Sequence, residues 1–229
     1  MFVFSPSNMS TYRTCPRRFE GQSITKEIVW KASAQKSRGT LVHNALEIAM
    51  RKGIDTMEAW PDGIDVDFTR RQLQRAAQMV KDGAQLFIEH EITLNQQLRP
   101  AAEGWWAKDA FIRCKADAII MPKDLRQPAL IIDFKTGKKW DSDDFQLRLE
   151  TLLLHLAYNR PVVNYEYWYV DVGDIEDGLI DYSQGLGPVA DIKELIREMK
   201  QAITNKDFPP KRNKFCNWCD FNKTPACGL

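Results

Sequence analysis

An apolar stretch that runs directly into charged residues is the feature that most constrains the fold. Residues 129–137 read ALIIDFKTG, and the nearly unbroken apolar run predicts a strand over 129–135 that is buried on both faces. Side chains two residues apart in a strand point to the same side, so Asp133 and Lys135 share one face where the strand leaves the core. A carboxylate there can bind a divalent cation, and an ammonium beside it can hold a phosphate or orient a water.

Further residues extend this predicted site. Asp117 lies sixteen residues before Asp133, and acids on neighbouring strands come within about 5 Å of each other. His43 lies in the first turns of a predicted helix, with Glu47 one turn later on the same face, and a neutral imidazole can complete a metal coordination shell. Gln146, near the start of the helix that follows the strand, is a candidate for contacting a phosphate backbone or a metal-bound water.

Each of these residues also has a plainer interpretation. An Asp-x-Lys pair in a strand is usually an exposed ion pair, and a histidine on an amphipathic helix is usually a surface or core residue. Glu47 alone is typical of a solvated helix face. The prediction of a metal site therefore depends on the order and spacing of the residues taken together.

The composition is that of a soluble globular protein with a single domain over residues 1–229. Of the 229 residues, 44% are hydrophobic and 28% are charged, which are ordinary values. A net charge of +1 excludes a histone-like electrostatic binder but not an enzyme with a local basic groove. No run of about 18 apolar residues predicts a membrane span. The N-terminus lacks the pattern of a secretory signal, so we expect a cytoplasmic protein.

Hydrophobic spacing predicts an α/β domain around a small mixed sheet. The predicted elements are a capped helix within 1–20 with Ser7 as the cap, a helix over 39–51, a loop over 54–67, a helix from about Phe68 to about Leu94, a strand pair within 103–121, the strand over 129–135, a helix that begins at Asp143 or Asp144, a strand over 164–172 and a helix over 188–204. Residues 54–102 as a whole are expected to form a mainly helical insertion.

Four of the five cysteines lie near the ends of the chain. Cys216 and Cys219 form a C-x-x-C pair, Cys227 follows them, and Cys15 lies some two hundred residues upstream. In a reducing compartment such cysteines are ligands or buried thiols rather than disulfides. Four thiolates hold either Zn²⁺ or an iron–sulfur cluster, and residue types do not decide between the two. Cys114, in a predicted strand, is expected to be a buried thiol.

The order of these motifs resembles the RecB-type branch of the PD-(D/E)xK nucleases. The matching features are Gly39-x-x-x-His43, an Asp in a strand, the DFKTG stretch and a Gln-bearing helix, together with the opening SPSNMSTYRTCPRRF. That branch includes the nuclease domains of bacterial recombination helicase–nucleases, CRISPR-adaptation nucleases and many phage exonucleases. The resemblance runs from Ser5 to Cys227 and implies a restriction-endonuclease-like core, a mixed sheet flanked by helices.

The resemblance implies a role for each matched residue. The implied ligands of Mg²⁺ or Mn²⁺ are His43, Asp117, Asp133 and the backbone carbonyl of Phe134. Lys135 would position or activate the attacking water, and Gln146 would match the Gln of the family's Q-x-x-x-Y motif. Glu150 stands where that motif has its Tyr, so the DNA-strand contact of the motif differs in this chain.

The resemblance also implies a [4Fe–4S] cluster, with Zn²⁺ as the alternative. Its ligands would be Cys15, Cys216, Cys219 and Cys227, which would join the chain ends at 1–20 and 205–229. Seven residues separate Cys219 from Cys227, a longer gap than in the family pattern. We expect the cluster to be structural and not a redox catalyst.

The implied function is metal-dependent hydrolysis of DNA phosphodiester bonds, by exonuclease more than endonuclease action, in recombination, repair or phage DNA processing. Recombinases, helicases and integrases are the expected partner classes, since the chain has no ATP-binding G-x-x-x-x-G-K-[ST] loop. One alternative is a non-cutting DNA-end-binding or adaptor module, which the intact set of His43, Asp117, Asp133 and Lys135 disfavours. Another is a zinc-stapled fold without a nucleic-acid role.

Basic and aromatic residues supply candidate DNA contacts. The basic candidates are Arg13, Arg17, Arg18, Lys138, Lys139, Lys211, Arg212 and Lys214, and the tryptophans that could stack on single-stranded bases are Trp105, Trp106, Trp140 and Trp218. Each of these residues is as readily a solvated charge or a core tryptophan.

Overall fold

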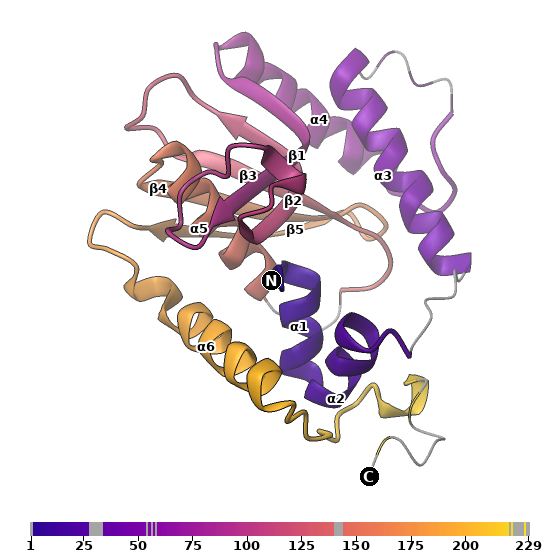
Figure 1. Cartoon of the computed structure of the whole chain (residues 1–229). Helices are drawn as coiled ribbons and strands as arrows, with labels where there is room; N and C mark the ends of the chain where they lie inside the picture. The colour runs from indigo at the N-terminus through magenta and orange to yellow at the C-terminus, as the bar shows by residue number, and fades with distance from the viewer. Residues whose placement is uncertain are drawn as a thin grey trace.

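A mixed five-stranded sheet forms the centre of the protein in a computed structural model that describes residues 2–27, 34–53, 55, 57, 59–139, 144–219, 221 and 227 (Figure 1). The strands follow one another across the sheet in chain order. They are β1 (Gln85–Asn95), β2 (Ala110–Met121), β3 (Ala129–Lys135), β4 (Val162–Tyr169) and β5 (Asp174–Asp181).

The pairing of β3 with β4 gives the sheet its mixed character. These two strands are parallel, whereas β1–β2, β2–β3 and β4–β5 are antiparallel. A parallel pair needs a crossover connection, which α5 (Phe145–Tyr158) supplies. The structure therefore confirms the predicted α/β fold with a small mixed sheet.

Helices cover both faces of the sheet (Figure 1). One face packs against α3 (Ala34–Lys52) and α4 (Val66–Lys81), and the other packs against α1 (Pro6–Thr14), α5 and α6 (Ala190–Asn205). Ile131 belongs to the core on the α5 side and Ile132 to the core on the α3 side, and both are fully buried. The predicted burial of β3 on both faces is thus confirmed.

Short helical segments complete the described chain. They are α2 (Pro16–Phe19), the π-helix η1 (Glu20–Ile24), and the 3-10 helices η3 (Gly104–Trp106), η4 (Gly187–Val189) and η5 (Cys216–Trp218). No helix in the described part of the chain is long and apolar enough to cross a membrane.

The predicted helix over 68–94 is wrong in its second half. Helix α4 ends at Lys81, and Gly83, with φ +100°, turns the chain into β1. A positive φ of this kind favours glycine, which is the common residue just past a helix end. Because β1 pairs with β2 along most of its length, the second part of 54–102 belongs to the core sheet and is not a helical insertion.

Three smaller predictions also need correction. Residues 104–106 form η3 and not the first strand of a hairpin, so the partner of β2 is β1. Strand β5 was not predicted. Helix α1 is capped by Ser5, whose side chain accepts from the backbone N–H of Asn8, and not by Ser7. The predicted start of α5 at Asp144 is confirmed, since this residue is its N-cap; Asp143 lies outside the described residues.

The N-terminal helices α1 and α2 lie beside the C-terminal segment that follows α6 (Figure 1). The side chain of Asn213 donates to the carbonyl of Thr14 at 3.2 Å, and the ammonium of Lys211 donates to the carbonyl of Arg13 at 3.1 Å. The guanidinium of Arg17 lies 4.3 Å from the ring centroid of Phe221. These contacts bring the N-terminal and C-terminal cysteines into one region.

Candidate active site

The site forms where β2 and β3 diverge. The last residue pair between these strands on this side is Ala118 with Ile132. One residue away on β2 and two residues further on β3, the backbone N–H of Phe134 donates to Oδ2 of Asp117 at 2.8 Å. The Asp117 carboxylate thus takes the place of a backbone acceptor and is held between the two separating strands.

In both β1 and β2, the alternation of side chains between the two faces of the sheet is interrupted at this point. Ala116 and Ile119 belong to the same core cluster, although strict alternation would place residues three apart on opposite faces. In β1, Phe87 and Ile92 likewise pack on one face. The change lies at Glu89 and Asp117, between the flanking pairs of the β1–β2 register.

Glu89 carries the backbone strain of this irregularity. Its φ is +53°, a left-handed conformation that costs a residue other than glycine on the order of 1–3 kcal/mol and that clusters at functional sites. The regular β1–β2 ladder on both sides holds the conformation in place. The result is a carboxylate on β1 directed to the same place as Asp117 on β2.

His43, Glu89 and Asp117 form the candidate metal group. Nδ1 of His43 lies 3.3 Å from Oδ1 of Asp117, and the ligand atoms of all three residues lie within 4.8 Å of one another. Among the described residues this is the one group of three or more such ligands. One imidazole and two carboxylates form a donor set that fits Mn²⁺ or Mg²⁺.

Glu89 was missed in the sequence because its strand was read as helix. No motif surrounds it in LFIEHEI. A correct assignment of β1 beside β2 would have placed an acid opposite Asp117. Glu89 also forms an ion pair with Lys115, so the group already contacts one cationic side chain.

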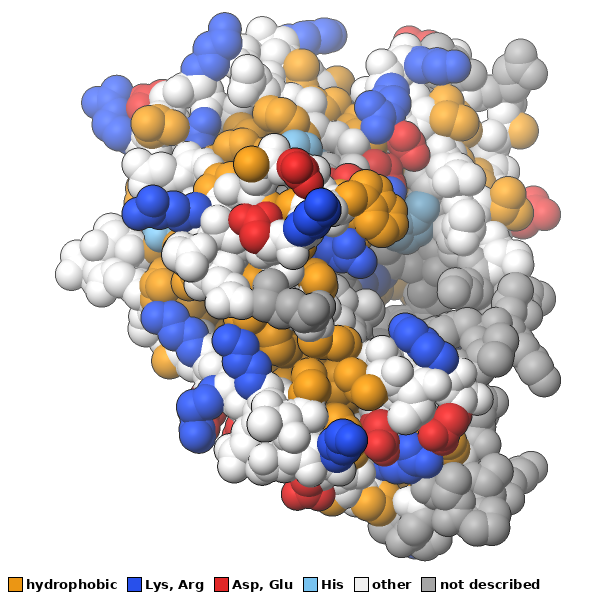
Figure 2. Space-filling view, in the orientation of Figure 1, with side chains coloured by type: hydrophobic (Ala, Val, Ile, Leu, Met, Phe, Trp, Pro, Cys, Tyr) orange, Lys and Arg blue, Asp and Glu red, His pale blue; other side chains and the backbone are white. Residues whose placement is uncertain are grey.

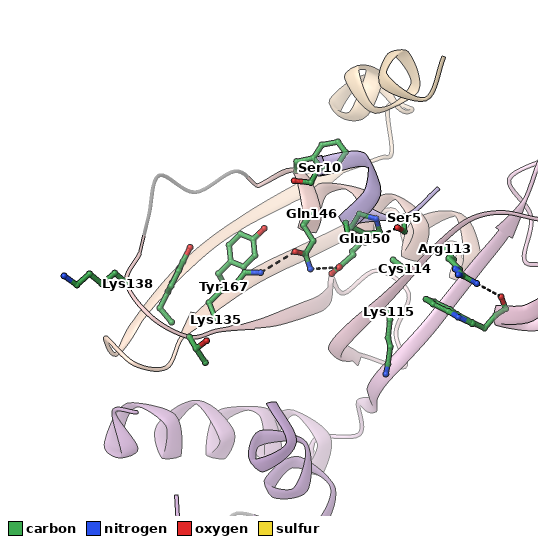
Figure 3. A pocket seen from close by; sticks show the side chains of 16 residues that line it. Ser5, Ser10, Arg113, Cys114, Lys115, Lys135, Lys138, Gln146, Glu150 and Tyr167 are labelled. Carbon is green, nitrogen blue, oxygen red and sulfur yellow. Dashed lines mark hydrogen bonds between the residues drawn. The ribbon is translucent and has the colours of Figure 1, made fainter. Parts of the chain in front are cut away.

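Asp133 lies in a second, buried group, and Figure 3 shows the other members of this group, Lys135, Gln146 and Glu150. Asp133 is 5% exposed; its Oδ2 lies 2.7 Å from the ammonium of Lys135, and its Oδ1 accepts from the Gln146 amide at 2.6 Å. Gln146 also donates to Glu150 at 3.0 Å and accepts from Lys135 at 3.4 Å. Gln146 on α5 therefore fixes the carboxylate and the ammonium relative to each other.

Burial raises the pKa of both carboxyls in this group. Burial and, to a smaller extent, the charge of Asp117 raise the pKa of Asp133 to about 6, against the opposing effect of the Lys135 charge. Burial and then the charge of Asp133 raise the pKa of Glu150, which is 1% exposed, well above its ordinary value. The arrangement favours one negative charge beside Lys135 and a neutral Glu150.

The pKa of His43 responds to opposing causes. Burial lowers it, but the hydrogen bond and charge of Asp117 outweigh burial, with a smaller contribution from Asp133, so that the net pKa is raised. The two groups are therefore electrostatically connected, although Asp133 is not among the three residues of the compact metal group.

A three-way contact holds α3 against the loop that follows β3. Asp171 accepts from the guanidinium of Arg38 at 2.7 and 2.8 Å. It also accepts from the backbone N–H of Gly137 at 2.5 Å. Arg38 lies on α3, one turn before His43, so this contact fixes the helix that carries the imidazole relative to the strand that carries Asp133 and Lys135.

A cavity of about 700 Å³ opens beside these groups (Figure 3). Lys135, Gln146 and Glu150 line its centre, with Lys138 towards one end and Arg113 towards the other. The space-filling view shows Lys and Arg side chains scattered over the visible face without one continuous basic stripe (Figure 2). The lysines and arginine of the cavity are therefore a local basic lining and not part of a globally basic surface.

The four end cysteines line one small cavity of about 20 Å³. They are Cys15, Cys216, Cys219 and Cys227. Backbone N–H groups point at two of the sulfurs, since Lys211 donates to Cys15 at 3.4 Å and Asn213 donates to Cys216 at 3.2 Å. Hydrogen bonds to sulfur are a means by which proteins tune bound clusters.

Cys114 lies apart from these four in β2 and is 1% exposed. Burial raises the pKa of its thiol well above the ordinary value. The prediction of a buried thiol is confirmed.

The predicted DNA contacts divide into two kinds. Lys138 and Trp105 line the active-site cavity, whereas Lys139 is paired with Asp174 at 3.1 Å and Arg17 with Glu20 at 2.7 Å. Trp140 and the side chain of Trp218 lie outside the described residues.

Comparison with solved structures gives matches of low sequence identity to this chain. The structure of SSO0001 has 16% identity and a TM-score of 0.49, covering 99% of this chain and 87% of that one. The alkaline exonuclease LHK-Exo from Laribacter hongkongensis has 9% identity and a TM-score of 0.34, covering 89% of each chain. Its complex with dAMP has 10% identity and a TM-score of 0.34, covering 89% of this chain and 88% of that one.

The family of this chain follows from a match between its sequence and a family model. A search of curated proteins finds no match. The family model described as the PD-(D/E)XK nuclease superfamily matches residues 3–224, which include every residue of both candidate groups and three of the four end cysteines. The chain belongs to the PD-(D/E)XK nuclease superfamily.

Proposed function

We propose that this chain is a divalent-metal-dependent deoxyribonuclease that hydrolyses DNA phosphodiester bonds. The observation that carries the proposal is the juxtaposition of His43, Glu89 and Asp117 with the Asp133–Lys135 pair at the diverging ends of β2 and β3. The family to which the chain belongs consists of nucleases, which indicates phosphodiester hydrolysis. The residues named above supply metal ligands and an ammonium group that this reaction can use.

The proposed metal ligands are His43, Asp117, Asp133 and the carbonyl of Phe134, and we add Glu89 from the geometry. A bound divalent cation would polarise the phosphoryl oxygen and lower the pKa of a water. Lys135 would hold that water or the negative charge that develops at phosphorus. Gln146, which contacts both Asp133 and Lys135, would keep the ammonium in position.

Exonuclease action in recombination, repair or phage DNA processing is the finer part of the proposal. It rests on the series of motifs from Ser5 to Cys227, which resembles a branch rich in phage exonucleases. A recombinase, helicase or integrase as partner belongs to the same level of inference.

The end cysteines are proposed to hold a [4Fe–4S] cluster. Among the described residues no three cysteine sulfurs lie within 4.8 Å of one another. A tetrahedral zinc site with Zn–S bonds of about 2.3 Å needs sulfurs about 3.8 Å apart, so the wider spacing around a common cavity favours the larger group. Iron analysis and absorbance near 400 nm in anaerobically purified protein distinguish the cluster from Zn²⁺.

The nuclease proposal is tested on end-labelled linear single- and double-stranded DNA with Mg²⁺ or Mn²⁺. We expect cutting by the wild type, its loss in Asp133→Ala and Lys135→Ala, and no change in Asp181→Ala, an exposed acid on the edge strand β5. Mononucleotide release from labelled ends would support exonuclease action. A folded, metal-supplied wild type that cuts no DNA would favour the non-cutting adaptor instead.

A further inference from the structure

A pair of tryptophans, of which Trp106 is exposed, lies beside the active-site cavity. Trp105 and Trp106 form η3 together with Gly104, and Trp106 is 82% exposed. Such exposure is unusual for a large aromatic side chain, which normally buries most of its surface. The proposed catalytic roles do not use either indole.

Arg113 holds both indoles. Its guanidinium lies 4.4 Å from the ring centroid of Trp105 and 5.6 Å from that of Trp106. Its Nη1 also donates to the backbone carbonyl of Trp105 at 3.1 Å. Because Arg113 belongs to β2, the tryptophans are fixed to the rigid sheet and are not carried by a free loop. The exposed indole is therefore preorganised.

Trp105 lines the same cavity as Lys135 and Gln146, and Arg113, which contacts both indoles, lies towards one end of it (Figure 3). Arg113 and Lys115 alternate with Cys114 in β2 and precede Asp117, so their side chains share one face of the strand. The cavity lining includes Trp105, Arg113, Lys115, Lys135 and Lys138 but only one acid, Glu150. Four basic side chains therefore line the cavity between the Arg113 end and the Lys138 end, and two of them, Lys115 and Lys135, are paired with Glu89 and Asp133 (Figure 3).

We propose that Trp105, Trp106 and Arg113 form a stacking platform for an unpaired base, so that the substrate strand reaches the catalytic groups as single-stranded DNA. This proposal rests on the proposed nuclease function and names the form of its substrate. In a duplex, neighbouring base pairs cover both faces of each base, so only an unpaired base can stack on an indole. Stacking of this kind tolerates every base, because each base has a π-face, and arginine adds a cation–π contribution.

The size of the cavity agrees with this substrate. A volume of about 700 Å³ lies in the range of sites for small molecules, roughly 300–1,000 Å³, and suits a few nucleotide units rather than a length of duplex. The cationic lining suits the phosphates between the stacked base and the scissile bond. We therefore expect a preference for single-stranded or frayed ends over blunt ends, with little dependence on base sequence.

The test measures binding and cutting by the full-length protein. Binding of a labelled oligothymidylate and of a blunt duplex of equal length is followed by fluorescence anisotropy in EDTA, which prevents cutting. We expect Trp106→Ala to weaken oligothymidylate binding about ten- to a hundredfold, as loss of one stacked base does, and to leave blunt-duplex binding unchanged. Trp106→Phe retains a ring and should stay within about threefold of the wild type.

Leu125→Ala serves as the matched control, since Leu125 is also exposed, at 52%, but lies outside the cavity lining. This control should bind both DNAs like the wild type. Equal binding by Trp106→Ala and the wild type would overturn the proposal, and so would an equal loss for oligothymidylate and duplex.

Cutting assays with Mn²⁺ separate this proposal from the proposed function. Wild type that cuts, with Trp106→Ala cutting single strands equally well, would reject the platform and leave the nuclease function standing. Wild type that cuts nothing but binds oligothymidylate through Trp106 would support the platform and reject the nuclease function.

Discussion

Asp117 is the side chain that connects the backbone of the site to its proposed metal ligands. Its Oδ2 accepts from the N–H of Phe134, and its Oδ1 lies beside His43. The first contact is structural and needs only an acceptor oxygen. The second, together with Glu89, depends on the negative charge. Substitution can separate the two roles.

Asp117→Asn and Asp117→Ala should therefore differ in stability but not in activity. Asparagine keeps an acceptor oxygen for Phe134, whereas alanine leaves that N–H without its partner, at a cost of about 1–3 kcal/mol. Both variants lose the charge, so we expect cutting to fall at least about a hundredfold in each. Thermal melts and cleavage rates check this pair. Wild-type cutting by Asp117→Asn would exclude Asp117 as a charged ligand.

Glu150 makes the free energy of unfolding of the metal-free protein depend on pH. The raised pKa of its buried carboxyl means that the folded state keeps a proton that the unfolded chain releases above its ordinary pKa. The unfolded state then binds fewer protons, so the free energy of unfolding falls as pH rises through this interval. Asp133, with a pKa of about 6, contributes in the same direction.

Glu150→Gln should flatten this dependence and raise stability near neutral pH. Glutamine keeps an oxygen that can accept from Gln146, and it does not ionise. Denaturant unfolding in EDTA between about pH 5 and pH 8 measures the slope of the free energy of unfolding against pH. A difference of one unit between the folded and unfolded pKa corresponds to about 1.4 kcal/mol. Glu194→Gln, at an exposed ion pair with Arg197, is the control. Identical slopes for Glu150→Gln and wild type would show that Glu150 does not titrate as described.

At the scale of whole elements, β2, β3, β4 and most helices could be predicted from the sequence, but β1 and β5 could not. The change of facing at Glu89 breaks the period of two, so Phe87, Ile88 and Ile92 fall at intervals that fit a helix. The adjoining α4 pattern then extends without interruption into the strand. Gly83 was the one local signal of a boundary.

The residues of the candidate site could likewise be predicted only where the element that carries them was predicted. Asp117, Asp133, Lys135 and Gln146 lie on elements that were recognised, and the structure brings them together. Glu89 depends on a strand irregularity and on pairing between distant segments. Neither is encoded in a local pattern, so this residue had to come from the three-dimensional structure.

The two chain ends form an element that the proposed cluster should stabilise. Contacts that already join them include the hydrogen bonds of Lys211 and Asn213, the Arg17–Phe221 contact and the Phe19–Phe208 ring pair, and a cluster would add a covalent connection to these. Cys216→Ser should therefore lose bound iron and lower the melting temperature by at least about 5 °C, which corresponds to roughly 2 kcal/mol in a chain of this size. Cys114→Ala should keep its iron, since Cys114 lies outside the cysteine cavity. Unchanged stability after loss of iron would show that the cluster is not a structural staple.

At the scale of the whole molecule, metal binding should stabilise the fold in a pH-dependent way. A ligand that binds only the folded state adds about 2.7 kcal/mol at a concentration one hundred times its Kd, or roughly 5–10 °C in melting temperature. The proposed ligands must be deprotonated to bind a cation. The pKa of Asp133 is about 6, and the pKa of His43 is raised above its ordinary value by Asp117 against the effect of burial.

Protons should therefore compete with the cation as pH falls through about 6, where Asp133 becomes protonated and His43 is already charged. The metal-free folded protein takes up protons at its buried carboxyls over this interval, so the stabilisation that the cation adds decreases. Melting curves with and without Mn²⁺ should show the full shift near about pH 8 and little shift near about pH 5. Asp117→Asn should show only a small shift at either pH. A shift in wild type that is equal at both pH values would mean that the cation binds elsewhere, away from the groups that titrate in this range.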